Sequence, residues 1–235
     1  MSGHSKWSTI KRKKGAADAK RGAIFTRLSK DITLAARDLG GNPDMNPSLR
    51  LAIKKARSSN MPVANIERAI KKGTGDLPGV KYDDIIYECY GPNGIAIILE
   101  CLTDNKKRTV SEIKNILSKN GGNLGESGCV NWMFEKKGTI SISKNDIEEE
   151  KLFDLEIEDY EDYEGNYILT TTPDNFDIVS SYLEKQNVNI EGEVGLVPKN
   201  TVEISNNDSS KVLNLMEQLD DHDDIQKVHS NFEII

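Results

Sequence analysis

The sequence predicts an α+β protein: a three-helix N-terminal domain followed by two ferredoxin-like α+β domains, one inserted in the other. Three observations predict this fold. Apolar residues recur with a helical period before residue 75, strand and helix patterns alternate after residue 84, and 235 residues exceed one average domain. We expect the domains at residues 1–75, at 80–136 together with 201–235, and at 137–200, the last being the insertion.

The first third begins with a small, polar, basic arm and continues as three helices. Gly40-Gly41 ends the first helix, Asn46 caps the second ahead of Pro47, and the third runs from Pro62 to Gly73. The residues expected to face inward are Ile24, Leu28, Ile32, Ala35 and Leu39 in the first helix, Leu49, Ala52, Ile53 and Ala56 in the second, and Val63, Ile66 and Ile70 in the third.

The remaining residues alternate between strands and helices. Strands are expected at 85–90, 95–102, 130–135, 139–143, 167–172, 188–197, 201–204 and 225–232. Helices are expected after an N-cap at Asp104 or Asn105, from a capping box at Asp146–Glu149, and after an N-cap at Asp174. A last helix is expected along the apolar stripe of Val212, Leu215, Met216 and Leu219. In the helix from Asp174, the residues expected inside are Ile178, Val179, Tyr182 and Leu183. The closing strand-helix-strand order completes the first α+β unit, which makes the middle segment an insertion.

Charge divides the chain into a basic front and an acidic body. Residues 1–80 hold 17 Lys and Arg against 6 Asp and Glu, a balance of +11, while the whole chain carries −7, so residues 81–235 carry −18. A basic module on an acidic body indicates that the front meets a polyanion. The longest apolar run, Ile95–Leu99, is far too short to span a bilayer, so we expect a cytoplasmic protein without a membrane partner.

Cationic side chains on flexible stems suit a phosphate backbone, and Trp7 could stack on an exposed base. The alternatives are a solvated arm with Trp7 folded back, and ordinary solvated charges on the helices. Because the surface is rich in lysine and poor in amides, structured RNA fits at least as well as base reading in DNA. The candidate nucleic-acid contacts are Lys6, Trp7, Lys11, Arg12, Lys13, Lys14, Lys20, Arg21, Arg27, Lys54, Lys55, Arg57, Arg68, Lys71 and Lys72.

A second candidate anion contact comprises Lys106, Lys107 and Arg108, at the expected start of a helix. The alternative is a helix cap at Asp104 with exposed basic residues beside it. The glycine-rich segment 119–125 follows a helix and lacks a Walker pattern, so we interpret it as a helix cap and a mobile loop.

No catalytic constellation is evident, so we expect a protein that is not an enzyme and has no cofactor and no small-molecule substrate. The three cysteines show no CxxC spacing and the three histidines lie far apart, so no metal site is expected. His222 lies among Asp220, Asp221, Asp223 and Asp224, which we interpret as a solvated acidic loop.

The sequence resembles the YebC family in seven motifs that follow one another along almost the whole chain. They are Gly3-His4-Ser5-Lys6-Trp7, Asp18-Ala19-Lys20-Arg21, Asn60-Met61-Pro62, Asn65-Ile66-Glu67-Arg68-Ala69-Ile70, Tyr90-Gly91-Pro92, Leu102-Thr103-Asp104-Asn105 with Arg108-Thr109, and Lys119-Asn120-Gly121-Gly122-Asn123-Leu124-Gly125. The resemblance implies a helical domain and two α+β domains, one inserted in the other. The acidic segment 146–164 departs from the family, where neutral helix formers are more usual.

The resemblance also implies a non-enzymatic, nucleic-acid-binding regulator. Members of the family are named probable transcriptional regulatory proteins, and others act in translation at the ribosome, including a mitochondrial translational activator. The hypothesis we favour is a translation factor that binds ribosomal RNA and relieves stalling. The alternatives are a DNA-binding transcriptional regulator and a protein-interaction scaffold whose charges are incidental.

Overall fold

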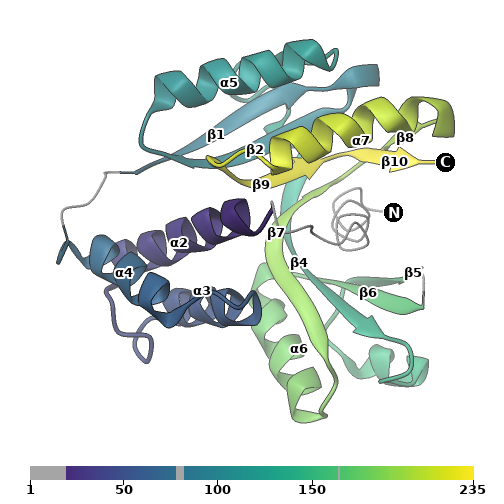
Figure 1. Ribbon diagram of the computed structural model, residues 1–235. Helices are drawn as coiled ribbons and strands as arrows, with labels where there is room; N and C mark the ends of the chain where they lie inside the picture. Colours follow the sequence, from purple (N-terminus) through teal and green to yellow (C-terminus); the bar gives the residue numbers. More distant parts are fainter. Residues whose placement is uncertain (1–19, 78–81, 164) are drawn as a thin grey trace.

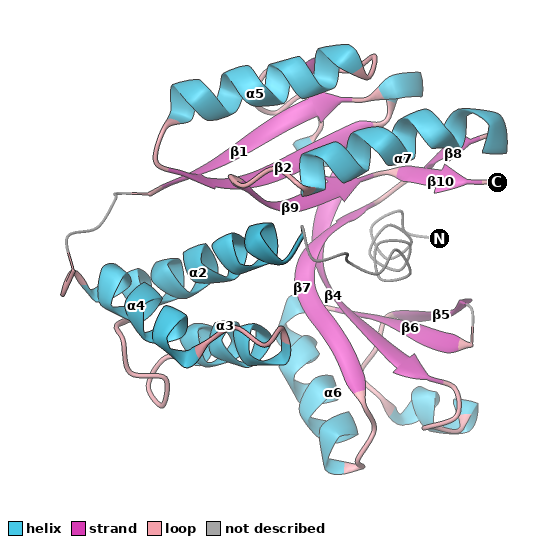
Figure 2. Ribbon diagram, viewed as in Figure 1, coloured by secondary structure: helices cyan, strands magenta, loops and turns pink. Residues whose placement is uncertain are grey.

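The computed structural model describes residues 20–77, 82–163 and 165–235, and the fold is α+β (Figures 1 and 2). Three helices come first: α2 (Lys20–Leu39), α3 (Pro47–Ser58) and α4 (Val63–Thr74). Two four-stranded antiparallel sheets follow, each with helices on one face (Figure 2). Among these residues, no helix combines the length and the apolar character that crossing a membrane requires.

The helical module has a small core of its own, built from the predicted apolar stripes. Asn46 caps α3 by accepting a hydrogen bond from the Leu49 N–H at 2.9 Å, and its amide donates to Ala35 O and Gly40 O at 2.8 Å. One predicted cap therefore also fixes the turn between α2 and α3. Two predicted inward positions are wrong, since Leu39 is 63% exposed and Val63 is 60% exposed.

The sequence analysis predicted that the third helix ends at Gly73, but this glycine lies inside α4. The helix continues to Thr74 and ends at Gly75, which has a left-handed φ of 84°. A Cβ on Gly73 would collide with Thr33 O and would lie 2.7 Å from the Ala36 Cβ. The glycine therefore allows close contact between α2 and α4, a packing role that its position near the helix end conceals.

The first sheet has the strand order β3-β1-β2-β9, with β1 (Asp83–Tyr90), β2 (Ala96–Thr103), β3 (Asn123–Leu124) and β9 (Ile225–Ser230). A short 3₁₀ turn, η1 (Pro92–Gly94), joins β1 to β2. Helices α5 (Lys106–Lys119) and α7 (Asn206–Asp220) cover one face of the sheet (Figure 1). All four residues of the predicted last stripe on α7 are buried. Strands β8 (Val202–Ile204) and β10 (Phe232–Ile234) form a parallel pair beside this sheet.

The second sheet has the order β5-β6-β4-β7. In the sequence, its four strands lie between β3 and β9 of the first sheet. Its strands are β4 (Phe134–Ser143), β5 (Asp159–Tyr163), β6 (Asn166–Thr171) and β7 (Ile190–Pro198), and α6 (Pro173–Lys185) packs against it. The chain leaves the first sheet after β3 and rejoins it at β9, an order that agrees with an insertion. The domain limits themselves remain a prediction.

The acidic segment 146–164 does not form the predicted helix. Instead, a six-residue 3₁₀ helix, η3 (Glu149–Asp154), precedes the edge strand β5, which the sequence analysis missed. An edge strand tolerates a run of charges because one side of it faces water. Two expected strands at 130–135 and 139–143 are in fact η2 (Asn131–Met133) followed by the single strand β4.

Two expected details of α6 are also wrong. Thr172, not Asp174, is the N-cap, since its side chain accepts a hydrogen bond from the Asn175 N–H. Ile178 is 57% exposed and Tyr182 is 45% exposed, so the apolar stripe on this helix is narrower than predicted.

The loop after β3 is held in place by a buried carboxylate. Glu88 accepts hydrogen bonds from the backbone N–H groups of Gly128, Val130 and Asn131 at 2.6, 2.8 and 2.8 Å. Burial alone would raise the pKa of Glu88, but the three donors lower it below its ordinary value. The Gly125 N–H also bonds to Glu88 O at 2.8 Å, and the glycine-rich segment contains the short strand β3 where the sequence analysis expected a loop.

Candidate nucleic-acid interface

The side chains that carry the strongest case for anion binding lie along one face of α4. Asn65, Arg68 and Lys72 are spaced by three and four residues, which places them on the same side of a helix. Opposite them, Phe25, Ser29 and Thr33 form a stripe on α2 with a spacing of four residues. Between the two stripes is a groove of about 350 Å³, closed on a third side by Tyr82 at the entrance to β1.

No carboxylate lines this groove within the described part of the chain. The full set of lining residues is Phe25, Thr26, Ser29, Lys30, Thr33, Asn65, Arg68, Ala69, Lys72 and Tyr82. Arg68 and Lys72 are exposed, and neither makes an ion pair or a side-chain hydrogen bond to any described residue. Two cations without carboxylate partners, in a groove without acidic side chains, suit an anionic ligand.

The floor of the groove is fixed to the α+β body by a buried ion pair. Lys30 is 6% exposed, and its Nζ donates to Asp224 Oδ1 and Asp223 O at 2.7 Å and to Leu102 O at 3.1 Å. Asp224 Oδ2 accepts hydrogen bonds from Thr103, Arg108 and Thr109 at 3.1, 2.7 and 2.8 Å. This carboxylate therefore ties α2 to the first sheet and to α5.

The surroundings of Asp224 keep it ionised. Burial alone would raise the pKa of Asp224, but hydrogen bonds from Arg108, Lys30 and Thr109 hold it far below the ordinary value of an aspartate. The hydrogen bond to Asp224 and the charge of this carboxylate in turn raise the pKa of Arg108. The helical module thus meets the body through a charged connection that persists at neutral pH.

The second candidate anion contact is largely occupied by this network. Arg108 donates to Asp104 at 2.8 Å and to Asp224 at 2.7 Å, while Lys106 lies 3.5 Å from Asp83. Asn105 caps α5 with its side chain, which decides between the two predicted caps, Asp104 and Asn105. Lys107 alone of the three basic residues has no carboxylate contact among the described residues, so this helix start offers little to a phosphate.

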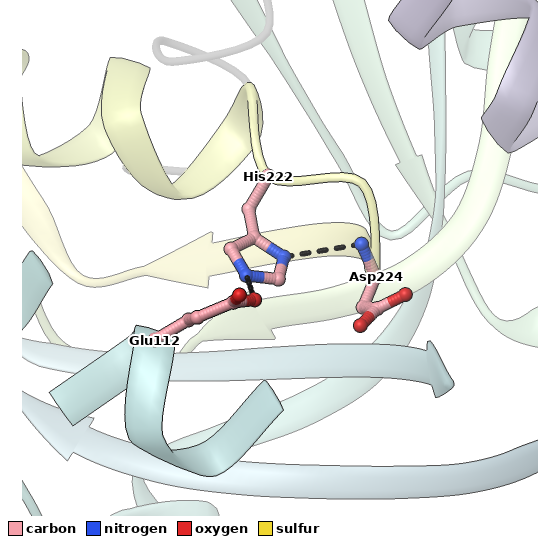
Figure 3. Close-up of side chains that lie close together, drawn as sticks. All are labelled: Glu112, His222 and Asp224. Atoms are coloured by element: carbon pink, nitrogen blue, oxygen red, sulfur yellow. Dashed lines mark hydrogen bonds and ion pairs between the residues drawn. The ribbon is translucent and has the colours of Figure 1, made fainter. Parts of the chain in front are cut away.

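Glu112, His222 and Asp224 form a cluster of metal-ligand type, in which one ligand atom of each lies within 4.8 Å of the others (Figure 3). The His222 Nε2 lies 2.9 Å from Glu112 Oε2, and its Nδ1 accepts from the Asp224 N–H at 3.1 Å. Because Lys30 and Arg108 already occupy the Asp224 carboxylate, a divalent cation would have to displace two cations there. The arrangement fits a link between α5 and the turn before β9 better than a metal site. The expectation that His222 lies in a solvated loop is wrong, since its side chain is 10% exposed.

Three candidate contacts on α2 and α3 face acidic groups of the body. Arg27 lies 3.4 Å from Asp220, and Lys54 lies 3.6 Å from Glu184 on α6. Lys55 lines a second cleft, of about 540 Å³, between the helical module and the sheets. Arg27 and Lys54 contact protein carboxylates, and Lys55 lines a cleft that contains acidic side chains, so we leave all three outside the candidate interface.

The other candidate contacts are divided between exposed and undescribed positions. Arg57 and Lys71 are exposed on α3 and α4, and no described residue bonds to their side chains. Lys20 and Arg21 begin α2, although their side chains lie outside the described ones. The remaining members of the set lie outside the described residues, namely Lys6, Trp7, Lys11, Arg12, Lys13 and Lys14.

Sequence reasoning missed the groove itself, and with it Phe25, Ser29 and Tyr82. The spacing of Phe25, Ser29 and Thr33 along one helix was a usable signal for two of them. No signal near Tyr82 indicated its contact with α2, because that contact depends on how the helical module packs against the sheet.

The fold and the groove define an α+β protein with a cationic helical module and two sheet-based units. Two family models cover this chain: the TACO1/YebC protein N-terminal domain matches residues 5–76, and the TACO1/YebC second and third domain matches residues 82–232. The chain belongs to the TACO1/YebC family, which confirms the resemblance seen in its motifs.

Similar proteins of full length carry regulatory names. A probable transcriptional regulatory protein of Desulfotalea psychrophila is 53% identical over 240 residues, covering 100% of this chain and 96% of the relative. Another, of Geobacter sulfurreducens, is 52% identical over 239 residues with the same coverage. The crystal structure of a conserved hypothetical protein from Aquifex aeolicus is 42% identical, covers 93% of this chain and 92% of its own, and superposes with a TM-score of 0.83.

Proposed function

We propose that this protein is a non-enzymatic, nucleic-acid-binding regulator of gene expression, and that it acts in the cytoplasm as a translation factor that binds ribosomal RNA and relieves stalling. The observation that carries the proposal is the groove between α2 and α4, in which no carboxylate of a described residue faces Arg68 and Lys72. Phe25 is five residues from Lys20, about 7.5 Å along the helix, so the groove opens close to the point where the basic arm joins α2.

The negative charge of the body favours a polyanionic ligand that contacts the protein at one face only. Residues 81–235 carry −18, which repels a polyanion from most of the body, whereas the arm and α4 attract it. RNA in a folded assembly offers phosphates and unpaired bases at close range, and lysine-rich surfaces bind these without reading a sequence.

A DNA-binding transcriptional regulator is the second candidate, and the names of the full-length relatives favour it. Such a protein needs side chains that read base edges in a duplex groove. Asn65 and Arg68 on α4 are the candidates for that task, since both line the groove. A protein-interaction scaffold is the third, and it predicts no steep dependence of nucleic-acid binding on salt.

The first experiment reverses the charge of the arm by changing Lys11, Arg12, Lys13 and Lys14 together to Glu. Each phosphate contact contributes about −0.7 to −0.9 to the slope of log K against log salt, so the variant should lose most of its affinity and of that slope. Circular dichroism should show unchanged helix content. Unchanged affinity would exclude the arm as the contact.

A second experiment separates RNA from DNA as the physiological target. Crosslinking in cells, followed by sequencing of the recovered nucleic acid, should return ribosomal RNA. Ribosome profiling of a deletion strain should show stalls at particular codons. Recovery of promoter DNA, with altered transcript levels and no stalls, would favour the transcriptional regulator instead.

A further inference from the structure

The groove between α2 and α4 combines three chemistries that rarely meet in one small cavity. Arg68 and Lys72 supply positive charge, Asn65 and Ser29 supply uncharged hydrogen-bonding groups, and the side chain of Tyr82 supplies an aromatic surface. Phe25 adds a second aromatic ring on the α2 side. A phosphate, a sugar with a base edge, and the face of a base are the groups that these side chains would bind.

Tyr82 is held in position by contacts on both sides of it. The Arg37 guanidinium donates to Tyr82 O at 3.1 Å and to Asp84 Oδ2 at 2.9 Å, which fixes the backbone at the start of β1. The Nζ of Lys30 lies 5.8 Å from the centroid of the Tyr82 ring, within the range of a cation–π contact. Because Lys30 is itself fixed by Asp224, the ring is positioned before any ligand arrives.

The phenol of Tyr82 stays neutral at physiological pH. Burial raises the pKa of Tyr82, and the nearby carboxylates of Asp104 and Asp224 raise it further. A neutral phenol can approach a base without adding negative charge to the groove. Lys30 and Arg108 balance the charge of Asp224, while Arg68 and Lys72 on α4 have no carboxylate partner among the described residues.

We infer that this groove binds one unpaired nucleotide of a single-stranded nucleic acid, with its phosphate at Arg68 and Lys72 and its base against Tyr82 and Phe25. This inference rests on the proposed function and specifies the form of nucleic acid that the site accepts. The base would sit at the junction between the helical module and the first sheet, because Tyr82 leads into β1 while the phosphate contacts come from α4.

The size of the groove selects an unpaired nucleotide over a duplex. At about 350 Å³ it lies at the lower end of the range for small-molecule pockets, which is enough for one nucleotide but not for a stacked pair of strands. A paired base keeps both faces stacked inside its helix and cannot reach an aromatic side chain. A base in a loop, a bulge or a single strand is free to do so.

The test uses an RNA pentamer of uridines with 2-aminopurine at its centre, because stacking on an aromatic ring quenches 2-aminopurine fluorescence and uridines themselves stack only weakly. The full-length protein should quench this signal, and a blunt RNA duplex of equal charge should compete weakly. Tyr82→Ala should weaken pentamer binding roughly tenfold and clearly reduce the quenching, with Phe25 left as the one aromatic ring of the proposed base site, since base stacking on aromatic side chains is sequence-tolerant and strong. Tyr82→Phe should restore both.

Phe153→Ala is the matched control, because Phe153 is an aromatic residue 73% exposed on the acidic body. This variant should bind and quench like the unmodified protein. If Tyr82→Ala quenches normally, or if the duplex competes as well as the pentamer, the inference is overturned. Either result leaves the proposed function standing as long as reversal of the arm charges still abolishes nucleic-acid binding, so the two ideas fail separately.

Discussion

Two hollows border the same helix, and their linings are opposite in charge. The groove between α2 and α4 contains no carboxylate among its described lining residues. The cleft on the other side of α2 is lined by five carboxylates and two lysines: Asp31, Asp84, Glu100, Glu193, Asp220, Lys55 and Lys227. The comparison shows that positive and negative charge are separated by the two sides of α2, and not simply by the boundary between the first third and the rest.

The difference arises from how α2 uses its own cations. Lys30 and Arg27 both point to aspartates of the body, Asp224 and Asp220. These ion pairs attach the helical module to the body, whereas the cations of α4 have no acidic partner among the described residues. The net charge of the N-terminal segment therefore overstates its capacity to bind a polyanion, because part of that charge serves the fold.

The largest expected effect follows from removing the carboxylate that attaches the module. Asp224→Asn should lower the free energy of unfolding by about 3–5 kcal/mol, because it leaves Lys30 buried without a counter-charge. Urea denaturation measures this loss. Glu112→Gln, at the exposed partner of His222, is the control and should cost no more than about 1 kcal/mol. Equal losses in the two variants would contradict the attachment role of Asp224.

A smaller effect should follow from pushing α2 and α4 apart. Gly73→Val places a branched side chain against Thr33 O and Ala36, and overpacking of this kind costs about 1–3 kcal/mol. Thermal unfolding measures the loss. Ala64→Val is matched to it, because it places the same valine side chain on an exposed turn of the same helix. If both variants unfold at the same temperature, the close contact at Gly73 is unimportant.

The carboxylates of Asp224 and Asp31, which lie on different sides of α2, should also affect stability in opposite directions as the pH falls. The pKa of Asp224 is lowered in the folded protein, so its contribution to stability is full above about pH 4 and is lost as pH falls toward the folded value. Burial raises the pKa of Asp31 in the cleft despite the nearby Lys55, so its ionisation opposes folding as pH rises through its folded value.

Melting temperatures of Asp224→Asn and Asp31→Asn between pH 3 and 7 test this contrast. The melting temperature of Asp224→Asn should fall furthest below that of the unmodified protein at neutral pH, and least in acid. Asp31→Asn should be at least as stable as the unmodified protein at neutral pH. A loss of stability in Asp31→Asn that grows toward neutral pH would show that this carboxylate is stabilised in the fold, contrary to the assignment.

The smallest effect is expected at the rim of the module. Lys54 lies 3.6 Å from Glu184, and both side chains are more than half exposed. Lys54→Ala should change the free energy of unfolding by less than about 1 kcal/mol, because solvent screens such pairs. Urea denaturation again provides the measurement, and a larger loss would mean that α3 and α6 are joined more firmly than this contact indicates.

The sequence predicted those features of the fold that depend on residues close together along the chain, such as helix caps and apolar stripes. The caps at Asn46 and Asn105 follow from residue type and spacing, and the buried stripe of α7 follows from its period. The predicted helix at 146–164 failed because an acidic, alternating segment can satisfy an edge strand as well as a helix start.

The sequence could not predict the partners that each cation finds in three dimensions. Arg68 and Arg108 look alike in the sequence, since each is a basic residue near the start of a helix. Only the fold places Asp224 against Arg108 and leaves Arg68 without a described carboxylate. The same reason explains why Tyr82 was not identified as a candidate contact.

The central claim is that nucleic acid binds on the α4 side of α2 and not on the acid-lined side. The most direct test is the salt dependence of binding to a fluorescent single-stranded RNA, measured for two double variants. The first variant carries Arg68→Glu and Lys72→Glu, and the second carries Lys54→Glu and Lys55→Glu. Both double variants change the net charge equally. The account predicts that the first pair weakens binding and lowers the slope of log K against log salt by about two units, while the second leaves both nearly unchanged. Equal losses in the two would contradict the account, because binding would then follow net charge alone.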